Sequence, residues 1–148
     1  MAETEVGRSA LERIEPQRGR LGTALRDYQL AVLNPEADWA ANVPPSLAAL
    51  RGAFEEHVEF TEAPDGLFDE MLHDGTIEVS SEIDQLRRDH IAVAGAIARA
   101  AEALDHPPSD EDHLREVVAS VARLVARHRR RGTQLLYDVY SVDTAAGD

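Results

Sequence analysis

The sequence predicts an all-α protein built as an antiparallel up-down four-helix bundle. Apolar residues recur at helical spacing in four long stretches, and breaks rich in proline, glycine and asparagine separate these stretches. Alternating strand-like segments are few and aromatic residues make up only 5% of the chain. A chain of 148 residues is long enough for one domain with a real core, so the four stretches are expected to pack together.

The four main helices are expected near residues 17–33, 46–62, 79–104 and 109–142. Asn34-Pro35 is expected to end the first, and the pair Pro44-Pro45 to start the second. Shorter helical pieces are expected at 36–42, which carries Trp39, and at 66–72.

The fourth helix is expected to begin with a capping box formed by Ser109 and Asp112. Residues 1–16 end in Pro16 and are expected to form a flexible or short helical arm. The bundle then covers residues 17–143, and residues 144–148 form a tail.

Composition narrows the classes of partner. The net charge of −13 disfavours nucleic acid and anionic membranes, and no apolar run reaches the roughly 20 residues of a membrane span. The chain has no cysteine, which removes disulfides and thiolate metal sites, and its acidic start lacks the order of a signal peptide. Together these features favour a cytoplasmic protein.

Three histidines stand at the centre of apolar stripes. His57 follows Leu50 and Phe54, His90 follows Leu86, and His128 follows Val125, each on a different predicted helix. At a rise of about 1.5 Å per residue, small errors in the helix ends would bring all three to one level of an antiparallel bundle. We therefore expect their rings to converge in one polar layer of the core.

Converging neutral imidazoles suit a metal that accepts nitrogen ligands, with iron and zinc as the natural choices. Glu62, five residues after His57 at the start of a turn, is the candidate fourth ligand, and its alternative role is a cap or salt bridge at that turn. The remaining histidines, which lie among acids and prolines, are expected on the surface: His73, His106 and His113.

Two features beside His128 leave alternatives open. Gly132 lies one turn later, where glycine costs about 1 kcal/mol relative to alanine, so it could leave room for a small ligand or haem. A basic run, Arg127 and 129–131, is interpreted as a solvated, ion-paired helix face, with docking of an anionic partner as the alternative.

The text HVEFTEAPDGLFDEM at 57–71, LRRDHIAV at 86–93 and HRRRGTQLLYDVYSVD at 128–143 resembles the hemerythrin-like (HHE) family, in a form common among actinobacterial proteins. The resemblance covers about residues 20–143. It implies a four-helix bundle with His57, His90 and His128 as ligands. In the iron-loaded members of the family it implies a non-haem di-iron centre that binds oxygen, nitric oxide or peroxide.

The chain departs from the family's di-iron pattern on every helix. The first predicted helix offers Leu21, Gly22 or Leu25 in place of a histidine. Elsewhere threonine stands at 61, alanine at 94 and threonine at 133, where the pattern has a glutamate, a histidine and an acid.

Because of these differences we expect a reduced site with one metal, held by His57, Glu62, His90 and His128. A small molecule is expected to bind or be sensed at this site. The competing hypothesis is a metal-free module whose polar core fixes helix register and whose surface binds a protein partner or a second copy of the chain.

Overall fold

A computed structural model describes residues 2–34, 38–73 and 75–141, with the side chains of residues 2–11 and 141 excepted. The elements in chain order are α1 (Ala2–Leu33), α2 (Trp39–Glu62), α3 (Leu67–His73), α4 (Ile77–Asp105), α5 (Glu111–Leu136) and a π-helical segment η1 (Tyr137–Ser141). Within these ranges every regular element is helical, which confirms the predicted all-α class.

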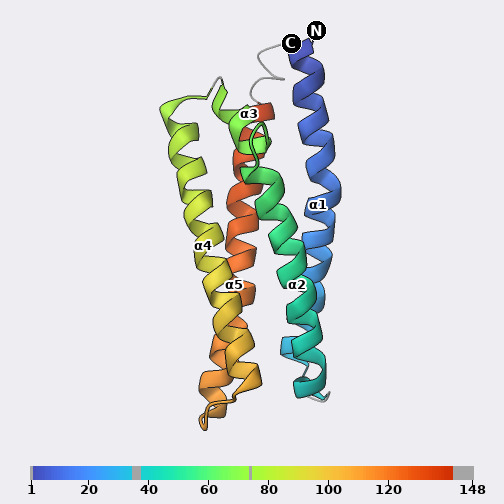
Figure 1. The fold of residues 1–148 in the computed structure, drawn as a ribbon, viewed down its shortest axis with the longest axis vertical. Helices are drawn as coiled ribbons and strands as arrows, with labels where there is room; N and C mark the ends of the chain where they lie inside the picture. Colours follow the sequence, from blue (N-terminus) through green and yellow to red (C-terminus); the bar gives the residue numbers. More distant parts are fainter. Residues whose placement is uncertain (1, 35–37, 74, 142–148) are drawn as a thin grey trace.

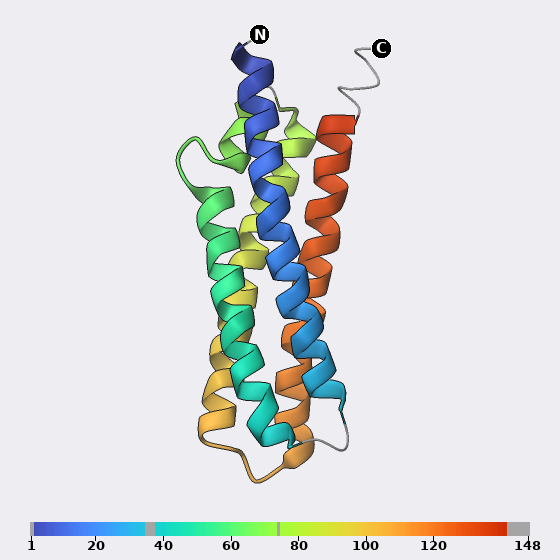
Figure 2. The ribbon, with the colours of Figure 1, turned by 90° about the vertical axis from the view of Figure 1, so that its right-hand side faces the viewer.

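The four long helices alternate in direction. α1 descends from the end of the molecule that also holds α3 and η1, α2 returns to it, and α4 and α5 repeat the pattern (Figures 1 and 2). α1 packs against α2 and α5, and α4 packs against the same two helices, so the four form a closed square. This arrangement confirms the antiparallel up-down bundle predicted from the sequence.

Prolines do not divide the helices as predicted. α1 continues through Pro16 from Ala2, and α2 begins at Trp39 and continues through Pro44 and Pro45. A helix-interior proline removes one hydrogen bond and costs about 3 kcal/mol, so tertiary packing must outweigh that preference. Ile14 is buried just before Pro16, and Val43 is buried just before Pro44, which supplies that packing.

Trp39 ties the start of α2 to the end of α1, because its indole Nε1–H donates to the carbonyl of Val32. The prediction of a separate helix at 36–42 is therefore wrong for residues 39–42, and residues 36 and 37 lie outside the described part of the chain.

The remaining boundaries stay close to the predicted ones, with one corrected cap. Asp110, not Ser109, is the N-cap of α5, and its side chain accepts from the backbone N–H groups of Asp112 and His113. Aspartate is as good a cap as serine and lies one residue nearer to the first helical turn. The tail at 144–148 and the end of the predicted fourth helix at 142 lie outside the described residues.

A tight turn follows the end of α2 and fixes the place of Glu62. Asp65 adopts a left-handed φ of 58°, and the amide of Gly66 donates to the carbonyl of Ala63. A Cβ at Gly66 would lie 2.6 Å from the carbonyl oxygen of Phe60, so only glycine fits without a shift of the backbone.

The core consists of two apolar clusters stacked along the bundle. One contains the residues toward the α1–α2 connection: Leu21, Leu25, Tyr28, Val43, Leu47, Leu50, Phe54, Val93, Ala96, Ile97, Ala100, Val118, Val121 and Val125. The other contains Ile14, Leu67, Phe68, Met71, Ile83, Leu86 and Leu135. On α2, α4 and α5 the position between the two clusters is a histidine, and a polar layer thus separates them.

Candidate metal centre

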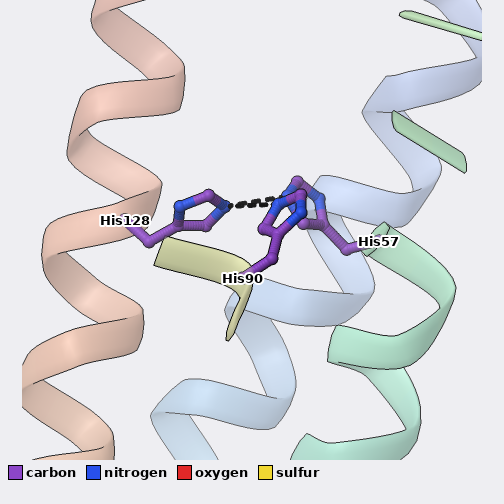
Figure 3. Close-up of side chains that lie close together, drawn as sticks. All are labelled: His57, His90 and His128. Atoms are coloured by element: carbon purple, nitrogen blue, oxygen red, sulfur yellow. Dashed lines mark hydrogen bonds between the residues drawn. The ribbon is translucent and has the colours of Figure 1, made fainter. Parts of the chain in front are cut away.

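The three histidines predicted to converge do so. His57 of α2, His90 of α4 and His128 of α5 point toward one another from three sides (Figure 3). Nε2 of His128 lies 3.1 Å from Nε2 of His57 and 3.1 Å from Nε2 of His90. One ligand nitrogen can be chosen from each of the three rings so that all three nitrogens lie within 4.8 Å of one another.

Two of the rings are held from behind by carboxylates. Nδ1 of His90 lies 2.6 Å from Oε2 of Glu62, and Nδ1 of His128 lies 3.1 Å from Oδ2 of Asp89. A carboxylate accepts a hydrogen bond from a ring nitrogen, so Nδ1 carries the proton in both rings. Nε2 of each ring then presents a lone pair to the centre of the cluster.

The sequence did not single out Asp89, although it is buried in the core of the site. Gln85 donates to its Oδ1 at 3.1 Å and Arg131 does so at 2.8 Å, so both oxygens are occupied. Burial opposes ionisation, but the hydrogen bonds from His128 and Gln85 and the charge of Arg131 lower the pKa of Asp89 overall. A usable signal was present, because position 89 lies three residues after Leu86 and four before Val93.

Burial disfavours the charged form of all three imidazoles. It lowers the pKa of His57 from 6.5 to about 3 and that of His128 to about 4, with neighbouring histidines adding to both shifts. Burial also lowers the pKa of His90, although Glu62 opposes the change. The cluster is therefore neutral near pH 7, with lone pairs available.

Two phenylalanine rings pack against the cluster. Phe54 meets His90 edge-on with ring centroids 5.6 Å apart, and it also contacts His57 and His128. Phe68 of α3 stacks on His90 at 5.7 Å with an interplanar angle of 13°. The short helix α3 thus covers the site.

A cavity of about 40 Å³ borders the cluster, and His57 and His128 form part of its wall. Since one water needs about 10–15 Å³ by this measure, the cavity can hold a molecule of a few heavy atoms. Gly132 lies in the wall, and a Cβ there would meet nothing within 4 Å, as expected of a glycine that leaves room beside His128. His57 lines the same cavity, and its Nδ1 is buried and has no hydrogen-bond partner among the described residues.

α1 brings no ligand to the layer of histidines. Between Ile14, in one apolar cluster, and Leu21, in the other, it places Arg18, which lines the cavity. Tyr28 lies away from the site, buried in the apolar cluster toward the α1–α2 connection. Its hydroxyl donates to the carbonyl of Val118 at 2.6 Å.

The other residues that the sequence singled out lie either beside the histidine cluster or on the surface. Glu62 lies beside the cluster, where its carboxylate contacts the outer nitrogen of His90 and Arg87 lies 3.9 Å from its other oxygen. The three histidines expected on the surface are exposed: His73, His106 and His113. The basic run is only partly a solvated face, because Arg131 pairs with buried Asp89 and Arg129 lines the cavity.

Comparison of the chain with family models, with curated proteins and with solved structures finds no match. Among the described residues, no helix combines the length and apolar character needed to cross a membrane.

Proposed function

We propose that this chain is a hemerythrin-like metal-binding bundle in which His57, His90 and His128 hold one ion of non-haem iron or zinc. The cavity beside the cluster would admit a small molecule such as oxygen, nitric oxide or peroxide, which the protein binds or senses. The family assignment is supported by the bundle, by the converging histidines and by the sequence resemblance around them.

One observation carries the proposal: Nε2 of His90 and Nε2 of His128 face each other at 3.1 Å while both Nδ1 atoms are held by carboxylates. No proton remains to bridge two such lone pairs, so they repel each other unless a cation lies nearby. Tetrahedral nitrogen ligands of one zinc ion lie about 3.3 Å apart, which matches this spacing. The donor set therefore fits a metal.

The carboxylates would act on the histidines. Asp89 and Glu62 would fix the tautomer and the ring orientation of His128 and His90, an arrangement that raises ligand basicity and that is common behind metal-bound imidazoles. A bound ion would supply Lewis acidity, and the cavity would leave room for a small molecule beside the three histidines that hold it. Glu62, whose Oε2 lies 2.6 Å from Nδ1 of His90, is proposed to contribute through that ring.

The haem alternative does not fit this cavity. Pockets for drug-sized ligands measure about 300–1,000 Å³, and the space beside Gly132 is about 40 Å³. The metal-free module survives as the competing hypothesis, since a polar layer could fix helix register without an ion.

The test is direct metal analysis of protein purified without a histidine tag, followed by zinc titration against a chromophoric chelator. We expect one equivalent of metal, and His128→Gln should weaken zinc binding at least about 100-fold, because losing a ligand costs more than losing its supporting partner. Cobalt(II) substitution should give the visible absorption of a nitrogen-ligated, four- or five-coordinate ion.

His113→Gln is the matched control, because His113 is exposed on the same helix as His128. It should leave zinc affinity unchanged. Equal affinity in the His128→Gln variant and the wild type, or no saturable binding in either, would reject the metal site and leave the helical module.

A further inference from the structure

Arginines from α1 and α5 meet at the rim of the cavity, where α1 passes α5. Arg18, Gly22 and Arg26 follow one another at four-residue spacing and so share one face of α1. Arg129 of α5 reaches across this face, and its guanidinium occupies the space above Gly22. Both Arg18 and Arg129 line the cavity.

This cluster is short of negative partners. Arg18 lies 3.5 Å from Glu15 and donates to the hydroxyl of Thr133, whereas no described carboxylate pairs with Arg129. The rim of the cavity therefore carries an excess of positive charge, which can attract an anion.

Gly22 gives the guanidinium its place. A Cβ at Gly22 would lie 2.8 Å from Nη2 and 3.3 Å from Cζ of Arg129, so any other residue would displace this group. Gly22 thus leaves the space on α1 that the guanidinium of Arg129 occupies.

We propose that Arg129 and Arg18 form a binding site for a small oxyanion, such as formate or nitrate, at the rim of the cavity beside the histidine cluster. Guanidinium groups present paired N–H donors that match the oxygens of a planar anion. The cavity volume of about 40 Å³ fits an anion of three or four heavy atoms better than a larger one.

A metal ion held by the histidines would add positive charge beside the cavity. His57 and His128 form part of the cavity wall, so an ion bound to them would attract an anion in the cavity. This contribution alone rests on the proposed function, and the contribution of the arginines does not.

The experiment is a titration of metal-free protein with sodium formate at constant ionic strength, followed by NMR of the arginine Nε–Hε groups and by calorimetry. We expect saturable binding with shifts concentrated at Arg18 and Arg129. Arg129→Gln should weaken binding about tenfold or more, the size of one lost charge-assisted hydrogen bond. Gly22→Ala, which keeps every charge but displaces the guanidinium, should also weaken it.

Two controls separate a local site from general electrostatics. Arg123→Gln removes the same charge from an exposed position of α5, and Gly19→Ala adds the same methyl group to α1 where nothing lies within 4 Å. Neither should change formate affinity. Non-saturable shifts in the wild type, or equal losses in Arg123→Gln and Arg129→Gln, would overturn the proposal.

Zinc titration of the wild type, run in parallel, keeps the two proposals distinguishable. Formate binding without zinc binding would reject only the metal site. Zinc binding without formate binding would reject only the anion site. If both bind, zinc-loaded protein should bind formate more tightly than metal-free protein, because the ion adds positive charge beside the cavity.

Discussion

The two nitrogens of His128 have different partners, and the difference determines what the ring can do. Nδ1 faces Asp89 and Nε2 faces the other two histidines. Since Asp89 is 8% exposed and bound by Arg131, its charge is held in place by the fold. The ring is thus fixed in the tautomer that offers Nε2 to an electrophile.

Asp89→Asn should weaken zinc binding by about 10–100-fold, the usual cost of losing a partner behind a metal-bound histidine. The amide lacks the charge that stabilises the Nδ1–H tautomer and also fails to balance Arg131. Competition with a chromophoric chelator measures the change. Asp84→Asn, at an exposed position of the same helix, is the control, and an equal effect of both substitutions would contradict the assigned role of Asp89.

Gly132 is expected to leave space beside His128 and to lower the stability of the fold relative to alanine. Gly132→Ala should raise the free energy of unfolding by up to about 1 kcal/mol, because alanine favours the helix and its methyl group would meet nothing within 4 Å. Urea denaturation measures this gain. Gly52→Ala, also in open helical surroundings, should gain similarly, and a loss of stability confined to Gly132→Ala would show that the space is not open.

At the scale of the element, α1 has a weak point that its packing overcomes. Pro16→Ala restores a helical hydrogen bond in the interior of α1 and should raise the stability of residues 2–16, offset by about 0.4–1 kcal/mol from the freer unfolded chain. Hydrogen exchange of the backbone amides should slow in this segment. Glu12→Ala, an exposed change in the same helix, should slow exchange much less, and unchanged exchange in Pro16→Ala would contradict the expectation.

Helical periodicity predicted the existence and the register of the long helices, because a buried stripe leaves a strong local signal. It failed at Pro16 and at the pair Pro44-Pro45, where local preference argues for a break. In each case an apolar residue just before the proline, Ile14 or Val43, is buried in a core cluster that several helices share, and this packing outweighs the local preference. Such contacts are not encoded in any short window of sequence.

The candidate site shows the same limit. The three histidines could be predicted to meet, since each replaces one apolar residue in a stripe and helix geometry fixes its depth. The roles of Asp89 and Arg18 could not be predicted, although position 89 follows the spacing of its stripe, because each role depends on which neighbouring helix the side chain faces. Asp89 reaches His128 across the α4–α5 contact, and Arg18 reaches Thr133 across the α1–α5 contact.

At the scale of the whole molecule, the polar layer between two apolar clusters makes stability depend on pH. In metal-free protein, burial holds the pKa of His128 at about 4 and that of His57 at about 3, whereas both titrate near 6.5 when unfolded. As pH falls below 6.5 the unfolded chain takes up protons first, so stability is lost. The loss ends near pH 3, once the folded histidines are protonated too.

A bound metal should add a second dependence, which a chelator can isolate. An ion that binds only the folded protein raises the melting temperature, and chelation at pH 7 should therefore lower it. His128→Gln should abolish this chelator effect, while His113→Gln should preserve it. Acidification should expel the metal because each ligand must stay neutral, so the melting temperatures with and without chelator should converge as pH falls. Identical melting at pH 7 with and without chelator, in protein first supplied with excess zinc, would contradict the metal site, and the pH dependence of the metal-free cluster would then stand alone.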